Sequence, residues 1–285
     1  MPNHVTNCFT ISGHKAEIEK IIIAAGIQAP SGEFNSHKFD FNGFIPMPEA
    51  LANSQAGYIA PIDTLLAHAD INQNLLDDKI IAFENFDRIA KKLNISGLSA
   101  DALNDLVKDG YAEKPLSDYL EFVKNNPVKL PAFQRAKDAL KNQDLYGYTD
   151  WYNWACAEWG TKWNAYEVSA TLQIGSQATQ ELDRKAFDAL DAEADVTLNV
   201  QFDTAWSVPE PIFDHIIENY QVTLQGESLD ELGNFACDYY TITHDNGSYL
   251  EMCIYDDFDT IKEFCCRIFG YSPFEDGEDD ELDTM

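Results

Sequence analysis

Lysine and arginine are absent from residues 186–261, although this stretch holds seventeen aspartates and glutamates. Residues 1–141 hold 18 acidic and 14 basic side chains, a net charge of −4, whereas residues 142–285 hold 31 and 5, a net charge of −26. Phosphate binding needs clustered Lys and Arg, so this composition argues against direct binding of nucleic acid or of an anionic membrane. The natural partner of the acidic half is a basic protein, a cation or water.

Disulfide and targeting signals are also missing. The six cysteines include no C-x-x-C pair, and the adjacent Cys265 and Cys266 cannot readily bridge each other. The chain does not open with the basic and apolar regions of a secretory signal. No apolar run approaches the roughly 18 residues of a membrane span. We therefore expect reduced thiols and a cytoplasmic protein.

Motifs of catalysis and metal binding are absent as well. The sequence has no H-E-x-x-H pair, nucleophile elbow, P-loop, dinucleotide-binding glycine motif or EF-hand loop. The acidic run at 256–260 would hold Ca²⁺ or Mg²⁺ only weakly. We expect a protein that is not an enzyme and needs no cofactor or metal. A catalytic site assembled in space across the two halves stays an open alternative.

The chain nevertheless has the composition of a folded protein. It is 45% hydrophobic and 12% aromatic over 285 residues, enough for a sizeable core in one large or two small domains. Apolar alternation and periodicity predict a β–α–β opening, with a strand at 4–12, a helix at 15–25 and a strand at 39–45. A nearly neutral helical insertion at 61–145 follows, with helices at 75–93, 100–108, 116–125 and 131–140.

Mixed structure returns in the second half of the chain. The predicted helices lie at 148–158, 181–192, 209–219 and 256–269, and the predicted strands lie at 166–173, 196–202, 222–224, 235–243 and 248–255. Asn246-Gly247 is a hairpin turn signal between the last two strands. We therefore expect an α+β body formed by residues 1–60 and 146–270, and a solvated, disordered acidic tail at 271–285.

Four of the five tryptophans fall between positions 151 and 163. Such a cluster suits either a stacking site or a protein interface, but it equally suits a helix packed against a sheet. A binding site for a small ligand or nucleotide would use Trp159 and Trp163 as a stacking floor and Lys162 as a lone cation. The acidic surroundings would repel a phosphate, so packing is the preferred interpretation.

Four short stretches carry a family resemblance. They are MPNHVTN at the start, GFIPMP at 43–48, WGTKWNAY at 159–166 and FDTAWSVPEP at 202–211. Together they resemble the YubB ferredoxin-like domain family, whose members come from plasmids, phages and integrated islands. The resemblance implies a ferredoxin-like α+β fold with a helical insertion and an origin on a mobile genetic element. It implies no reaction and supplies no catalytic residues.

Carboxylates at helical spacing form three candidate patches. Glu210, Asp214 and Glu218 recur every four residues, so about 6 Å of helix rise separates successive carboxylates on one face. Phosphates along a DNA strand recur at a comparable step. The other two patches are a second helical one, Asp188, Asp191 and Asp195, and a third at Asp256, Asp257 and Asp259.

These features predict a non-enzymatic interaction protein of a mobile element, acting as a DNA mimic. Its acidic surface would occupy the nucleic-acid groove of a basic host protein used in defence or DNA processing. A small-ligand or nucleotide module is the alternative hypothesis. The target and the oligomeric state stay open.

Overall fold

The fold is described here from a computed structural model. It describes residues 3–28, 32–71, 91, 95, 106, 108–111, 114–176, 181–244 and 247–270. The chain divides into two compact units, Met1–Pro46 with Ala155–Met285, and Met47–Trp154. The second unit therefore covers residues 47–154, whereas the sequence predicts a helical insertion at 61–145. The predicted tail at 271–285 lies outside the described residues.

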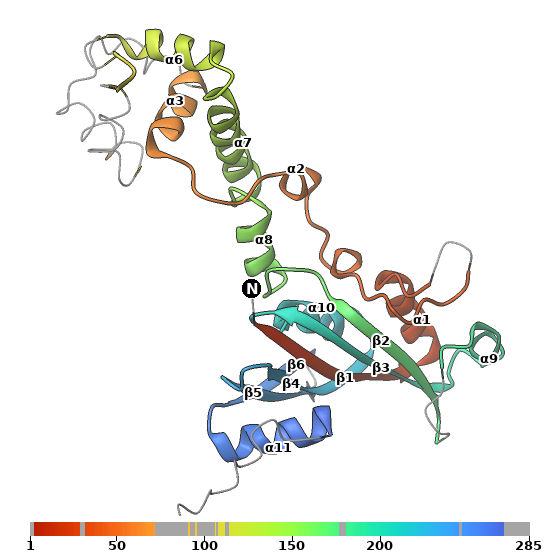
Figure 1. The fold of residues 1–285 in the computed structure, drawn as a ribbon. Helices are drawn as coiled ribbons and strands as arrows, with labels where there is room; N and C mark the ends of the chain where they lie inside the picture. Colours follow the sequence, from red (N-terminus) through yellow and green to blue (C-terminus); the bar gives the residue numbers. More distant parts are fainter. Residues whose placement is uncertain are drawn as a thin grey trace, which may run out of the picture. The chain divides into compact units, whose positions relative to one another are not determined.

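The first unit is built on a six-stranded sheet in the order β2-β3-β1-β4-β5-β6, with every neighbouring pair antiparallel (Figure 1). Six elements form its framework, in chain order β1 (His4–His14), α1 (Lys15–Ala24), β2 (Tyr166–Ile174), β3 (Asp195–Ala205), α10 (Glu210–Asn219) and β4 (Val222–Asp230). This β-α-β-β-α-β succession, with β1 between β3 and β4, is the ferredoxin-like arrangement. The predicted α+β class is confirmed.

Three further elements complete this unit. The hairpin of β5 (Ala236–His244) and β6 (Gly247–Tyr255) extends the sheet beyond β4. The short helix α9 (Arg184–Asp188) lies between β2 and β3 in the chain, and α11 (Phe258–Phe269) ends the described residues. The predicted hairpin is present, with His244 paired to Gly247, although Asn246 itself lies outside the described residues.

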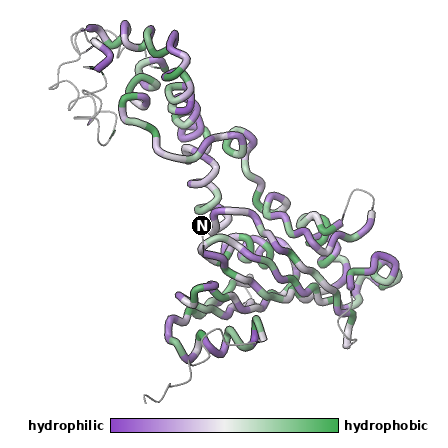
Figure 2. Tube along the Cα trace, viewed as in Figure 1, coloured by the Kyte–Doolittle hydropathy of each residue, from purple (hydrophilic) through white to green (hydrophobic). Residues whose placement is uncertain are grey.

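Alternation along the strands places the core on one face of the sheet. Val5, Phe9 and Ile11 of β1 are buried. The buried residues of the two helices are Ile18, Ile21 and Ile22 of α1 and Ile212, Phe213, Ile216 and Ile217 of α10. The other face carries polar residues in β1 to β3, and Figure 2 shows this mixture of hydrophilic and hydrophobic positions along each strand. Helix α11 covers the β4–β5 end of this second face, where Ile261 and Phe264 pack with Leu229 and Ala236.

The predicted strand at 39–45 is wrong. Residues Phe41–Gly43 form a 3₁₀ helix, capped by Asp40, whose carboxylate accepts a hydrogen bond from the Asn42 amide. A Cβ at Gly43 would lie 1.6 Å from the Ala24 carbonyl oxygen, so the two backbones touch here. The phenylalanines of this segment are buried in the core, and the strand that follows α1 is therefore β2, beyond the helical unit.

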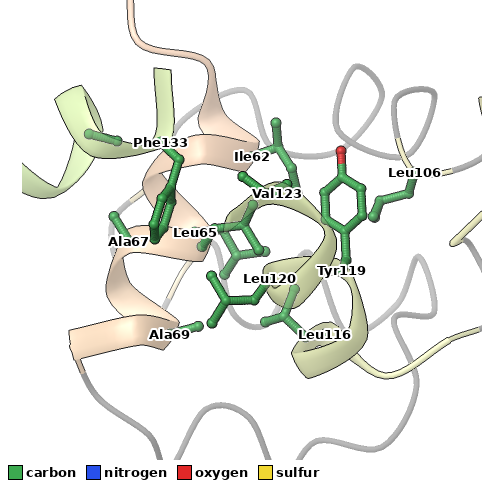
Figure 3. Close-up of a cluster of buried hydrophobic side chains, with 12 residues drawn as sticks. Ile62, Leu65, Ala67, Ala69, Leu106, Leu116, Tyr119, Leu120, Val123 and Phe133 are labelled. Atoms are coloured by element: carbon green, nitrogen blue, oxygen red, sulfur yellow. The ribbon is translucent and has the colours of Figure 1, made fainter. Parts of the chain in front are cut away.

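The second unit is helical. It contains α2 (Glu49–Ala52), α3 (Pro61–Ile71), α6 (Leu116–Asn125), α7 (Leu130–Tyr146) and the first half of α8 (Trp151–Glu158). Its core brings apolar side chains of α3, α6 and α7 together, among them Leu65, Leu120 and Phe133 (Figure 3). The predicted helices at 116–125 and 131–140 are confirmed, whereas those at 75–93 and 100–108 lie largely outside the described residues.

Within the part of the chain that can be described, no helix has the length and apolar character that crossing a membrane requires.

A buried polar network links four strands of the sheet on the core face. The Asn7 side chain donates hydrogen bonds to the Val5 carbonyl and to the Thr204 hydroxyl, both at 2.9 Å. Its side-chain oxygen accepts a hydrogen bond from the Ser228 hydroxyl at 2.8 Å, and the Ser228 and Tyr239 hydroxyls lie 3.2 Å apart. The network thereby connects β1 with β3, β4 and β5.

We predict that Asn7→Ala lowers the free energy of unfolding by about 2–3 kcal/mol, because Thr204 and Ser228 would lose buried partners. Urea denaturation followed by circular dichroism measures the change. Thr223→Ala, at an exposed position of β4, is the control and should cost less than about 0.5 kcal/mol. Equal effects of the two substitutions would show that the network does not stabilise the sheet.

Candidate functional site

Helix α10 presents the first acidic patch as a row. The helix buries Ile212, Phe213, Ile216 and Ile217 against the sheet, which turns Glu210, Asp214 and Glu218 to its other side. Glu210 and Glu218 are exposed and Asp214 is half-buried.

The three carboxylates of this α10 row repel one another. Partial burial, and then the charges of Glu210 and Glu218, raise the pKa of Asp214. The carboxylates four residues before and four residues after Asp214 therefore disfavour its ionised form. This interaction is expected for side chains at i and i+4 on one helix face.

The second predicted patch is not a helical row, so that prediction is wrong. Helix α9 ends at Asp188, which forms an ion pair with Arg184 at 2.8 Å. Asp191 lies in the following turn, and Asp195 is the first residue of β3.

Tertiary contacts explain the early end of α9. The Lys15 and Ala16 amides, at the start of α1, donate hydrogen bonds to the Ala194 and Ala192 carbonyls. If α9 continued through this segment, its own hydrogen bonds would engage those carbonyls or point them away from the start of α1. The turn at 189–194 therefore caps α1 and leads directly into β3.

The third patch lies at the start of α11. Asp257 caps this helix, and its carboxylate accepts a hydrogen bond from the Thr260 amide at 2.9 Å, which lowers the pKa of Asp257. Asp256 and Asp259 beside it are exposed. Because α11 lies on the opposite face of the sheet from α10 (Figure 1), these carboxylates do not extend the α10 row.

Burial separates the roles of the tryptophans. Trp159 is only 5% exposed; its indole N–H donates to the Ile45 carbonyl at 2.8 Å, and its ring packs edge-on against Phe41. It is a core residue and does not offer a stacking floor. Trp163 is 37% exposed and remains accessible.

Two of the sequence stretches noted above, 159–166 and 202–211, lie against each other. The Thr161 hydroxyl donates to the Ala205 carbonyl at 2.8 Å and accepts from the Ala205 amide at 3.2 Å. The Ser207 hydroxyl donates to the Gly160 carbonyl. A side chain at Gly160 would collide with Pro211, at 2.7 Å. These contacts fix the loop before β2 against the start of α10.

This packing creates an exposed cation–aromatic stack. The Lys162 ammonium lies 4.7 Å from the centre of the Trp163 ring and 4.8 Å from that of Trp206. Trp206 is 42% exposed and has a left-handed backbone (φ 75°), with its amide bonded to the Asn3 carbonyl at 3.0 Å. Sequence reasoning missed Trp206, because no local pattern pairs it with Lys162.

The polar face of the sheet holds a concavity of about 680 Å³, lined by hydroxyl, amide and acidic side chains that include Thr10, Asn199, Gln201 and Glu227. Cys8 also lines it, but burial and the charges of Glu227 and Asp203 raise the pKa of its thiol to about 11. This thiol is therefore protonated near neutral pH and is a poor nucleophile.

A histidine and a tyrosine meet at the end of this face. The His4 Nδ1 atom lies 2.7 Å from the Tyr166 hydroxyl, whose pKa is raised to about 12 by burial and by the charges of Asp203 and Glu231. Within the described ranges, no group of three potential His, Cys, Asp or Glu metal ligands occurs.

Replacing the middle carboxyl of the α10 row by an amide should stabilise the protein at neutral pH. A raised folded-state pKa favours folding only while Asp214 is protonated, so the wild type loses stability as pH rises above about 3.8. Asp214→Asn should show a higher urea midpoint at pH 7 and no difference well below pH 3.8. Asp138→Asn, on α7, should give no gain. A pH-independent effect of Asp214→Asn would exclude ionisation of the partly buried Asp214 carboxyl beside Glu210 and Glu218 as its cause.

Comparison with known proteins finds a family match in the second half of the chain. A family model described as "Ferredoxin-like domain in Api92-like protein" matches residues 186–264. A search of curated proteins found no match. The crystal structure of protein api92 from Yersinia pseudotuberculosis aligns with 90% of this chain and 99% of its own, at 10% identity and a TM-score of 0.33. The family match agrees with the topology, so residues 186–264 are similar to the ferredoxin-like domain of Api92-like proteins.

Proposed function

We propose that the protein is a non-enzymatic DNA mimic of a mobile genetic element that acts in the cytoplasm. It would occupy the nucleic-acid groove of a basic host protein used in defence or DNA processing. The observation that carries the proposal is the α10 row of three carboxylates, in which partial burial and then the charges of Glu210 and Glu218 raise the pKa of Asp214. The resemblance to the YubB family supports the origin on a mobile element.

The spacing of the α10 row suits a phosphate-binding groove. Successive carboxylates are about 6 Å apart along the helix axis, close to the axial rise of two nucleotides on one DNA strand at about 3.4 Å each. No lysine or arginine lies between 186 and 261 to neutralise the row. A basic groove would therefore be attracted at long range, with fast association and a steep dependence on salt.

The stack of Trp163, Lys162 and Trp206 supplies anchors beside this row. Trp206 lies four residues before Glu210, and the hydrogen bonds at Thr161 and Ser207 hold the two loops together. Exposed tryptophans are enriched among the residues that dominate binding energy at interfaces. Lys162 restrains both rings before binding, which lowers the entropy lost on association.

The structure narrows the proposed contact surface. Asp188, Asp191 and Asp195 form no row, and Asp256, Asp257 and Asp259 lie on the other side of the sheet. Trp159 is buried in the core, so it cannot serve as the stacking surface that the small-ligand alternative requires. We therefore assign the contact to α10 and the adjoining tryptophans.

The test has two steps. Binding proteins are first recovered from host lysate at low salt and eluted at high salt. Displacement of labelled duplex DNA from each recovered protein is then measured by fluorescence anisotropy. The wild type should displace DNA, and Glu210→Lys with Glu218→Lys should weaken displacement by about 10- to 100-fold at low salt.

A charge-matched control separates the α10 row from net charge. Asp118→Lys with Glu121→Lys changes net charge equally, at exposed positions of α6. This variant should displace DNA like the wild type. If both variants weakened DNA displacement equally, the effect would come from net charge and not from the α10 row. The absence of any salt-dependent DNA-binding partner would overturn the proposal.

A further inference from the structure

The two edge strands of the sheet, β2 and β6, differ in their backbone partners. The β2 edge is partly closed by the segment at 36–37: the Ala170 amide donates to the Ser36 carbonyl at 2.9 Å, and the His37 Nδ1 atom lies 3.0 Å from the Val168 carbonyl. The β6 edge has no backbone partner among the described residues other than β5. One edge is therefore available for strand pairing.

Strand β6 also lacks the devices that usually protect an edge. Its sequence GSYLEMCIY contains no lysine, arginine or proline, and Glu251 is its only charged residue. Its pairing with β5 shows no register shift. Natural edges are commonly blocked by lysine, proline or a bulge, so an unprotected nine-residue edge suits strand addition.

The backbone geometry shows which groups face outward. The Asp230 amide donates to the Phe235 carbonyl, so these two residues form a hydrogen-bonded pair one position beyond Leu229 and Ala236, the last pair of the β4–β5 register. Antiparallel pairs alternate, so the even-numbered residues of β5 point their amides and carbonyls to β6. In the β5–β6 register, the even-numbered residues of β5 pair with the odd-numbered residues of β6. The backbone amides and carbonyls of the even-numbered residues of β6 therefore point outward, away from β5. These residues are Ser248, Leu250, Met252 and Ile254.

Apolar side chains flank this edge. Ile254 is 69% exposed and Tyr249 is 48% exposed, on opposite faces of β6. Tyr240 of the neighbouring strand is 43% exposed and lies directly opposite Glu251. An added strand could cover apolar surface on both faces while pairing its backbone with β6.

Charge decides between a second copy and a different partner. Glu251 is the central residue of β6, so a symmetric antiparallel pairing of two copies over the full length of β6 would set it against its own equivalent. Like charges directly opposite are destabilising, and each copy carries a net charge of −30. A strand with a lysine or arginine opposite Glu251 would instead form a favourable cross-strand pair.

We infer that the β6 edge binds an extended, basic segment of a partner protein by adding it to the sheet as a seventh strand. The inference rests on the proposed function for the sign of the partner's charge, but it uses a surface separate from the α10 row. The partner would thus contact the acidic half both through a groove and through a strand.

The probe is a nine-residue peptide that alternates lysine with valine, used with the full-length protein. The basic peptide should bind in fluorescence anisotropy and slow hydrogen exchange at the Leu250 and Met252 amides. The same peptide with a fully N-methylated backbone, or with glutamate in place of lysine, should not bind. Glu251→Lys should weaken binding about fivefold.

Leu250→Pro removes one outward amide at an edge position, where proline is compatible with a folded sheet. It should abolish peptide binding, whereas Leu250→Val should not. Binding that survives N-methylation or Leu250→Pro would overturn the inference, as would dimerisation of the free protein through β6.

The Glu210→Lys with Glu218→Lys variant separates this inference from the proposed function. If it loses DNA displacement and keeps peptide binding, both proposals stand. If it loses peptide binding while Leu250→Pro keeps it, the peptide binds the α10 row, and only the β6 inference fails. If it keeps displacement while Leu250→Pro loses peptide binding, only the DNA-mimic proposal fails.

Discussion

The hydrogen bonds of the buried Asn7 side chain are the constraint on which the first unit depends. Asn7 joins β1 to Thr204 of β3 and Ser228 of β4, and Ser228 lies beside the Tyr239 hydroxyl of β5. Buried polar groups are stabilising only when all find partners, so this network favours a single register among four strands. Thr204 also donates to the Ser207 carbonyl, which connects the network to the loop that carries Trp206. The position of the exposed tryptophan stack therefore depends on the core.

Electrostatic repulsion is tolerated because a continuous apolar layer opposes it. Helix α10 carries the three-carboxylate row on one side and buries Ile212, Phe213, Ile216 and Ile217 on the other. Burying such side chains is worth about 1.5–3 kcal/mol each, whereas like-charge pairs four residues apart cost only a few tenths. The acidic surface can thus be held in a fixed shape, which a disordered acidic chain could not provide. A fixed shape is what a binding groove of defined geometry would recognise.

Several elements could be predicted from local pattern alone, and the failures have physical causes. Helices α6, α10 and α11 follow from apolar periodicity with capping or proline signals, and the β5–β6 hairpin follows from its turn residues. The phenylalanines at 39–44 alternate like a strand, but they fill the core from a 3₁₀ turn that Gly43 allows to approach Ala24. The helix predicted at 181–192 ends early because the start of α1 uses the carbonyls of Ala192 and Ala194.

By itself, the sequence determined the absence of bases from 186–261, the α+β class and the carboxylate row of α10. Each depends on composition or on the apolar and acidic periodicity within single segments, and these are local properties. Tertiary structure alone decided that Asp257 caps α11 on the far face, that Trp159 is buried, and that the Lys162 ammonium lies near the rings of both Trp163 and Trp206. It also decided that the β2 edge is partly closed by residues 36–37, whereas the β6 edge has no further backbone partner in the described part of the chain. Such relations join residues far apart in the chain, and only strand order and packing bring them together.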